Sequence, residues 1–120
     1  MKPKHQAAGA RLRLVLAPGI AIGPGKADLL AAIAETGSIS AAGRRLKMSY
    51  RRAWMLVEEL NTTFKSPLVS AGKGGAHGGG ARLTETGQTV LRRFRSVEAK
   101  TAKAIARDLA ALTALAKSGA

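Results

Sequence analysis

The sequence predicts a mainly α-helical fold with small β elements: a winged helix-turn-helix with an N-terminal strand pair and a long C-terminal helix. Three observations predict it. Residues 24–64 hold three segments with apolar residues at helical spacing, and the last two are joined by a very short turn. Two strand-like stretches, 68–72 and 81–83, flank the Gly-rich run 73–80. An apolar stripe then continues from residue 90 almost to the end of the chain.

The composition fits one domain with an extension. The chain has 120 residues, of which 46% are hydrophobic and only 3% are aromatic. This predicts close-packed helices around small aliphatic side chains, with Trp54, Phe64 and Phe94 as core anchors. We expect a flexible N-terminus at 1–10, a winged helix-turn-helix domain at 11–90, a long helix at 84–117 and a tail at 118–120.

The charge indicates a polyanionic partner. The formal net charge is +13, and the basic residues run through the whole chain rather than forming a tail. The chain contains no Cys, and its two His residues, His5 and His77, are far apart in sequence. We therefore expect no metal site, no cofactor and no catalytic activity. No membrane span or signal peptide is indicated, so the expected location is cytoplasmic and nucleoid-associated.

The N-terminal segments show first a strand pattern and then a helix pattern. Residues 11–16 alternate in polarity, which predicts a strand, and Pro18-Gly19 predicts a turn into a return strand at 20–22. Pro24 fits the first turn of a helix, and Gly37 fits its C-terminal end.

The next two helices carry capping residues. Ser38 or Ser40 can cap a helix over 41–47, and Ser49 can cap another that extends to Phe64. Thr84 can cap the long C-terminal helix. The turn at Met48-Ser49 then completes a helix-turn-helix.

The helix that begins after Ser49 is the candidate recognition helix. Residues at the N-terminal end of such a helix reach base edges in the major groove, and Arg binding guanine is the commonest specific contact. We expect Arg51 and Arg52 to contact bases. The competing interpretation is an Arg-rich face that is merely solvated. The candidate DNA-binding residues are Ser38, Ser40, Arg44, Ser49, Tyr50, Arg51, Arg52, Met55, Lys73, His77 and Arg82.

Two further features of this region have alternative explanations. Trp54 could stack on a base, but its position between Ala53 and Leu56 favours an anchor between helices. The Gly-rich loop is no phosphate-binding loop, because Gly74 follows Lys73 where Ser or Thr is required. We expect this loop to be the wing, whose cations approach the DNA backbone.

The C-terminal helix has an apolar stripe that would be exposed to water in an isolated chain. It could fold back on the domain, but its length favours pairing with a second copy. A helix lying on a membrane is the alternative, with Lys100, Lys103, Arg107 and Lys117 facing lipid. The candidate dimerisation residues are Val90, Phe94, Val97, Ile105, Leu109 and Leu112.

A family resemblance covers residues 11–117. The combination of "ETGSIS", "SYRRAW", "PLV", a Gly-rich loop and "LTETGQTVL" resembles the N-terminal DNA-binding domain of the molybdate-dependent transcriptional regulators, the ModE family. A weaker likeness extends to LysR-type winged helices. The resemblance implies a homodimer on a palindromic promoter site. It places residues 49–52 on the recognition helix, 73–82 on the wing and the long helix at the dimer interface.

The sequence departs from that family at its C-terminus. Full-length members carry oxyanion-binding domains, whereas this sequence ends at Ala120 and resembles a stand-alone form. Molybdate is thus a possible ligand that this chain alone does not support. The expected function is regulation of molybdenum- or oxyanion-related genes through double-stranded DNA. The alternatives are an oxyanion sensor that binds the anion at the dimer interface and a sequence-indifferent architectural DNA-binding protein.

Overall fold

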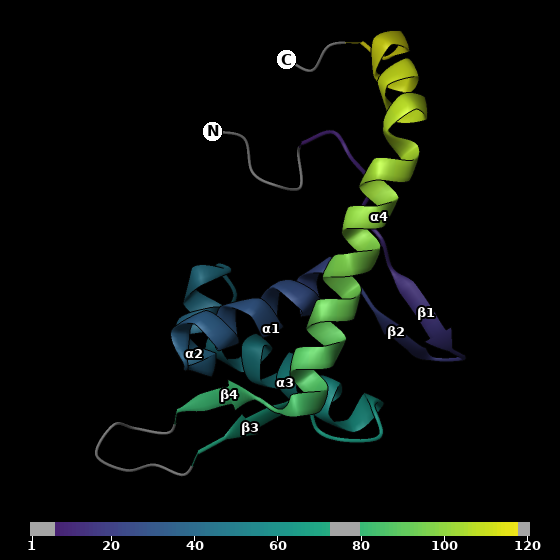
Figure 1. Cartoon of the computed structure of the whole chain (residues 1–120). Coiled ribbons are helices and arrows are strands. Elements are labelled where there is room, and N and C mark those ends of the chain that lie inside the picture. The colour runs from purple at the N-terminus through teal and green to yellow at the C-terminus, as the bar shows by residue number, and fades with distance from the viewer. Residues whose placement is uncertain (1–6, 73–79, 118–120) are drawn as a thin grey trace.

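The computed structural model describes residues 7–72 and 80–117 (Figure 1). The predicted flexible start, the C-terminal tail and the wing residues Lys73 and His77 fall wholly or partly outside these ranges. The predicted fold class is confirmed: most described residues are helical, with two small strand pairs. The elements are β1 (Leu14–Ala17), β2 (Ile20–Ile22), α1 (Pro24–Thr36), α2 (Ile39–Arg45), α3 (Tyr50–Thr63), β3 (Val69–Ala71), β4 (Ala81–Leu83) and α4 (Glu85–Leu115).

The core lies where α1 meets α2, α3, β4 and the start of α4. α1 supplies Leu29, Leu30 and Ile33, which are completely buried. The core takes one large side chain from α3, Leu60, and one from α4, Phe94. α1 is thus the central helix against which α3 and β4 pack.

The turn between α2 and α3 is fixed by capping and close packing. Ser38 caps α2 and Ser49 caps α3, each accepting a hydrogen bond from a backbone N–H three residues later at 3.1 Å. Of the two proposed caps for α2, the structure uses Ser38. A Cβ on Gly43 would lie 3.0 Å from the Ala53 Cβ, so α2 and α3 approach closely at this point. The chain leaves α2 through Lys47, which has a left-handed φ of 58°.

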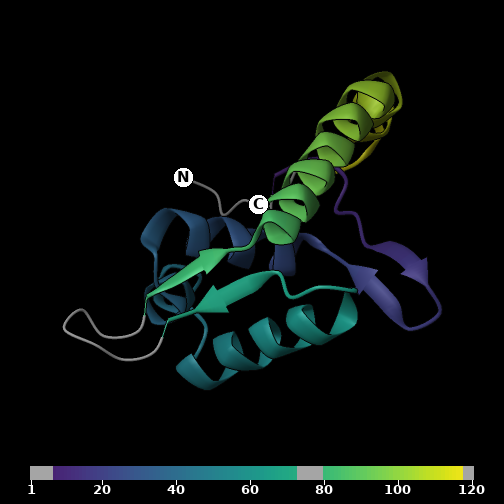
Figure 2. The ribbon, with the colours of Figure 1, turned by 60° about the horizontal axis from the view of Figure 1, so that its bottom comes forward.

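The β3–β4 pair is held against both α3 and α4. Antiparallel pairing matches Val69 with Leu83. The Asn61 side chain of α3 accepts from the N–H groups of Leu68 and Val69 at 2.9 Å and donates to the Val69 carbonyl. Figure 2 shows the two strands lying between α3 and the start of α4. The β3–β4 pair and the recognition helix therefore form one unit.

The N-terminal hairpin departs from the strict alternation that the sequence predicts. β1 and β2 pair antiparallel, but the register shifts between Val15 and Ala17, so Leu16 is an extra residue. As a result Val15 and Leu16 are both exposed, whereas alternation would have placed them on opposite faces. The hairpin thus carries an exposed apolar edge.

α4 runs from the domain out into solvent, as Figure 1 shows. Its N-terminal half packs on the core, with Val90 and Leu91 partly buried. Phe94 corrects one prediction: its side chain is only 2% exposed and lies in the core, so it is not available to a second chain. Further along, Leu112 and Leu115 are 65% and 84% exposed.

Candidate nucleic-acid interface

The exposed face of α3 is the candidate interface. The helix buries Ala53, Val57 and Leu60 against the domain. Because residues advance about 100° around a helix, Arg51 and Met55 lie on the side opposite this buried stripe. Both are exposed. The buried stripe fixes the helix, and the outward face is left free to contact a ligand.

Charge is distributed unevenly along α3. Arg51 and Arg52 lie in its first turn, whereas Glu58 and Glu59 follow about two turns later. Of these acidic residues, Glu59 pairs with Lys26 of α1 at 3.4 Å. The N-terminal half of the helix is therefore the half suited to approach a polyanion.

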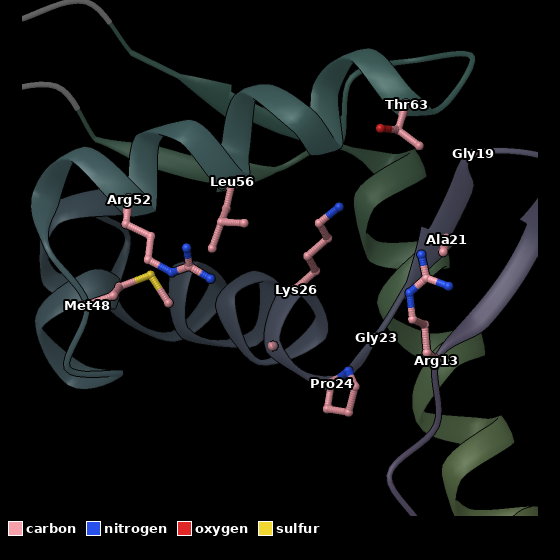
Figure 3. Close-up of a pocket in the computed structure, with 11 residues that line it drawn as sticks. Arg13, Gly19, Ala21, Gly23, Pro24, Lys26, Met48, Arg52, Leu56 and Thr63 are labelled. Carbon is pink, nitrogen blue, oxygen red and sulfur yellow. The ribbon is translucent and has the colours of Figure 1, made fainter.

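Arg51 and Arg52 do not share one face. They are separated by about 100° around the helix axis. Arg52 lines a hollow between α3, α1 and the N-terminal hairpin, together with Leu56 and Lys26 (Figure 3). Arg51 is absent from that lining and faces outward. The two arginines predicted to contact bases therefore lie in different places: Arg51 faces outward, and Arg52 lies on a flank of the helix.

Trp54 corrects a second prediction. It is 39% exposed rather than buried as a core anchor. Its ring lies 6.1 Å from that of Tyr50, at an interplanar angle of 59°. Trp54 is two turns before Asn61, which binds Val69 of β3, so the aromatic pair occupies the flank of α3 that faces the β3–β4 pair. The exposed face of α3 is therefore apolar on one side and cationic on the other.

The remaining predicted residues have different surroundings. The hydroxyls of Ser38 and Ser49 cap helices, and Ser40 is half-buried. Arg44 is exposed on α2. Arg82 is exposed on β4, opposite Ser70 of β3. The contributions of Lys73 and His77 lie outside the described residues.

The sequence prediction missed three cations near this surface. Lys47 lies in the turn between α2 and α3, while Arg13 and Lys26 line the hollow beside Arg52. Lys47 directly precedes the predicted turn residues Met48 and Ser49, so its position in the sequence could have indicated that it lies near the recognition helix. Nothing in the local sequence links Arg13 to Arg52, because only the fold brings both to the lining of one hollow.

One ion-pair network fixes α4 on α1. Arg95 donates to Asp28 at 2.8 Å and to Glu98 at 2.9 Å. Partial burial opposes its charge, but the hydrogen bonds to Asp28 and Glu98 outweigh burial, and the pKa of Arg95 is raised. Arg95 is therefore a structural cation that is engaged away from α3.

The described residues contain neither a metal-binding cluster nor a membrane-spanning helix. Within 7–72 and 80–117, no three His, Cys, Asp or Glu side chains are grouped so that they could hold a metal ion. In the same ranges, no helix is both long and apolar enough to cross a bilayer.

A family model matches residues 26–88, which run from the first turn of α1 through the helix-turn-helix and wing to the first turn of α4. This model describes the bacterial regulatory helix-turn-helix proteins of the lysR family. The chain belongs to that family. As a lysR-family protein it contains the family's helix-turn-helix in α2 and α3.

Curated relatives confirm the resemblance to the molybdate-dependent regulators. The chain is 44% identical over 85 residues to the molybdenum-pterin-binding protein MopB of Rhodobacter capsulatus, covering 71% of this chain and 32% of the relative. It is 42% identical over 96 residues to MopA of the same organism, and this match covers 80% of this chain and 36% of the relative. It is 35% identical over 89 residues to the molybdenum transport protein ModE of Azotobacter vinelandii, and this match covers 74% of this chain and 33% of the relative. The chain thus spans about a third of the length of these relatives.

A solved structure has the same fold. The DNA-binding domain of CbnR, crystallised in complex with DNA, superposes with a TM-score of 0.57 over 73% of this lysR-family chain and 95% of that domain. The sequence identity is 24%. This likeness supports the winged helix-turn-helix assignment of the fold.

Proposed function

We propose that this chain binds double-stranded DNA sequence-specifically as the DNA-binding part of a transcriptional regulator. The observation that carries the proposal is the outward position of Arg51 in the first turn of α3. Arg51 projects from a helix that is held by its buried stripe on one side and by β3 through Asn61 on the other. A rigidly held helix with a free Arg at its N-terminal end is suited to contact base edges in the major groove.

We further propose that two copies bind a palindromic site together. The support is the exposed apolar surface on two elements that project from the domain: Leu112 and Leu115 on α4, and Val15 and Leu16 on the hairpin. Burying this surface against a second copy would remove it from water. Two-fold symmetry would then place the two α3 helices in successive major grooves, about 34 Å apart or a multiple of that.

We also propose that the regulated genes concern molybdenum or related oxyanions. The support is the naming of the relatives: two are called molybdenum-pterin-binding proteins, and a third is called a molybdenum transport protein. Such a regulator would act in the cytoplasm, at the nucleoid.

Selection of bound duplexes from a random DNA library tests the DNA-binding proposal. We expect a palindromic consensus with two half-sites of the same sequence. Random duplex bound as tightly as any selected duplex would contradict the proposal and favour a sequence-indifferent architectural protein. Genome-wide mapping of binding sites with and without molybdate would then test the molybdenum assignment. Sites with no relation to molybdenum or oxyanion genes would contradict it.

A further inference from the structure

A hollow beside α3 gathers basic residues from three elements. It has a volume of about 380 Å³ and lies between α3, the start of α1 and the N-terminal hairpin (Figure 3). Arg52 belongs to the first turn of α3, Lys26 to the first turn of α1 and Arg13 to the segment just before β1. Residues 13, 26 and 52 are far apart in sequence, so only the fold brings these cations to one hollow.

The charge of this hollow is incompletely neutralised. Lys26 pairs with Glu59 at 3.4 Å. In the part of the chain that the structure describes, no ion pair joins Arg13 or Arg52 to an acidic side chain. The lining itself contains no Asp or Glu. The hollow is therefore positive and suits an anionic ligand.

The arrangement of the cations suggests an extended anion rather than a small one. In Figure 3 the three charged groups do not converge on one point: Lys26 lies between Arg52 on one side and Arg13 on the other. A single oxyanion would be held best by groups that meet around it. A row of separate cations instead matches the successive phosphates of a nucleic-acid strand, each of which carries one charge.

The location of the hollow fits the same ligand. A helix with its side chains is about 10–12 Å wide, and the major groove is about 12 Å wide. When the Arg51 face of α3 points at the base edges, the flanks of the helix face the two phosphate strands that form the groove walls. Arg52 lies on the flank away from the wing, about 100° from Arg51.

We propose that the hollow formed by Arg13, Lys26 and Arg52 binds the DNA backbone along the groove wall opposite the wing. This inference rests on the proposed function and deepens it. It reassigns Arg52 from base contact to phosphate contact. It also adds Arg13 and Lys26 as anchoring residues that carry no sequence preference of their own. The β3–β4 pair and the hollow would then lie on opposite flanks of α3.

The salt dependence of binding tests the proposal. The slope of log K against log salt is negative, and each lost phosphate contact makes it less steep by about 0.9. We expect the double variant Arg13→Gln, Lys26→Gln to lose roughly two units of slope on both the selected duplex and a random duplex of equal length. The matched control is Lys103→Gln, Arg107→Gln, which removes one Lys and one Arg from the exposed, projecting part of α4. Its slope should remain that of the wild type.

A second variant separates charge from structure. Lys26→Arg keeps the cation and should bind like the wild type, whereas Lys26→Gln should not. Equal slopes for the hollow variant and the α4 control would overturn the proposal. So would saturable binding of inorganic phosphate that depends on Arg13 and Lys26 without any change in the DNA slope, because that result indicates a small-anion site.

The outcome is distinguishable from failure of the proposed function. If the hollow variants match the wild type while Arg51→Ala loses sequence preference, only the inference about the hollow fails. If the wild type shows no sequence preference, the proposed function fails. The slopes on random duplex then still decide whether the hollow contacts phosphates.

Discussion

The Arg95 guanidinium on α4 and the Asp28 carboxylate on α1 lie 2.8 Å apart, although 67 positions separate them in sequence. This contact joins the central helix of the domain to the projecting helix. Both side chains are about one-third exposed, so solvent weakens the pair. We expect Arg95→Met to lower the free energy of unfolding by about 1–2 kcal/mol, measured by urea denaturation.

An exposed ion pair provides the control for Arg95. Arg45 and Glu35 lie 3.4 Å apart and are at least half exposed. Arg45→Met should cost less than about 0.5 kcal/mol. A double-mutant cycle between Arg95→Met and Asp28→Asn should give a coupling energy above that of the Arg45–Glu35 cycle. Equal coupling in the two cycles would contradict the assigned role of Arg95.

Gly87 is required by the contact between the start of α4 and the backbone before β3. A Cβ at this position would overlap the Leu68 carbonyl oxygen. Thr84 fixes the same junction: its N–H donates to the Leu68 carbonyl at 2.9 Å, and its hydroxyl donates to the Pro67 carbonyl at 2.7 Å. We expect Gly87→Ala to destabilise the fold by about 3 kcal/mol or more, because backbone must move.

Gly25 is the matched control for Gly87, since both lie in the first turn of a helix. Apart from its chain neighbours and the adjacent backbone of α1 itself, no atom lies within 4 Å of a Cβ built on Gly25. Gly25→Ala should therefore be neutral or stabilise by about 0.4–1 kcal/mol. Thermal unfolding of both variants checks the pair, and similar melting temperatures would contradict the packing argument.

Local signals predicted most of the fold. The capping roles of Ser49 and Thr84, the helix end at Gly37 and the strands around the Gly-rich loop all follow from short-range chemistry, and the structure contains each of them. The departures arise where tertiary packing decides. Leu16 forms a bulge in β1, a feature that polarity alternation does not reveal.

The candidate site was predictable only in part. Helical spacing correctly placed Arg51 and Met55 on the outward face of α3. Helical spacing could not show that Trp54 is exposed, because neighbouring elements decide whether a residue at the edge of a buried stripe is covered. The prediction of Phe94 as a core anchor is confirmed, but helical spacing also assigned it to the dimer interface, since the apolar stripe of α4 continues unchanged past the point where the domain ends.

Trp54 should matter for binding more than for stability. It is partly exposed and stacks at a tilt on Tyr50, on the flank facing the wing. We expect Trp54→Ala to lower the free energy of unfolding by about 1–3 kcal/mol, less than for a fully buried Trp, because 39% of the residue is already exposed to water. It should weaken DNA binding at least several-fold in a fluorescence anisotropy titration. The control is Leu60→Ala in the core, which should cost about 2–5 kcal/mol.

The exposed leucines of α4 should govern association. Leu112→Gln with Leu115→Gln replaces the two most exposed large apolar residues of the described chain. We expect sedimentation velocity to show a shift from dimer to monomer, with the fold retained by circular dichroism. Thr113→Gln on the same turn is the control and should remain dimeric. A double variant that sediments like the wild type would contradict dimerisation through α4.

The most direct test of the account is a base-by-base binding profile of the wild type, Arg51→Ala and Arg52→Ala on the selected duplex. Arg51 faces outward, so its loss should abolish the preference at one base pair per half-site, at a cost of about 1–3 kcal/mol. Arg52 lines the hollow, so its loss should weaken binding to all sequences alike. An unchanged profile for Arg51→Ala would contradict the assignment of α3 as the helix that contacts bases.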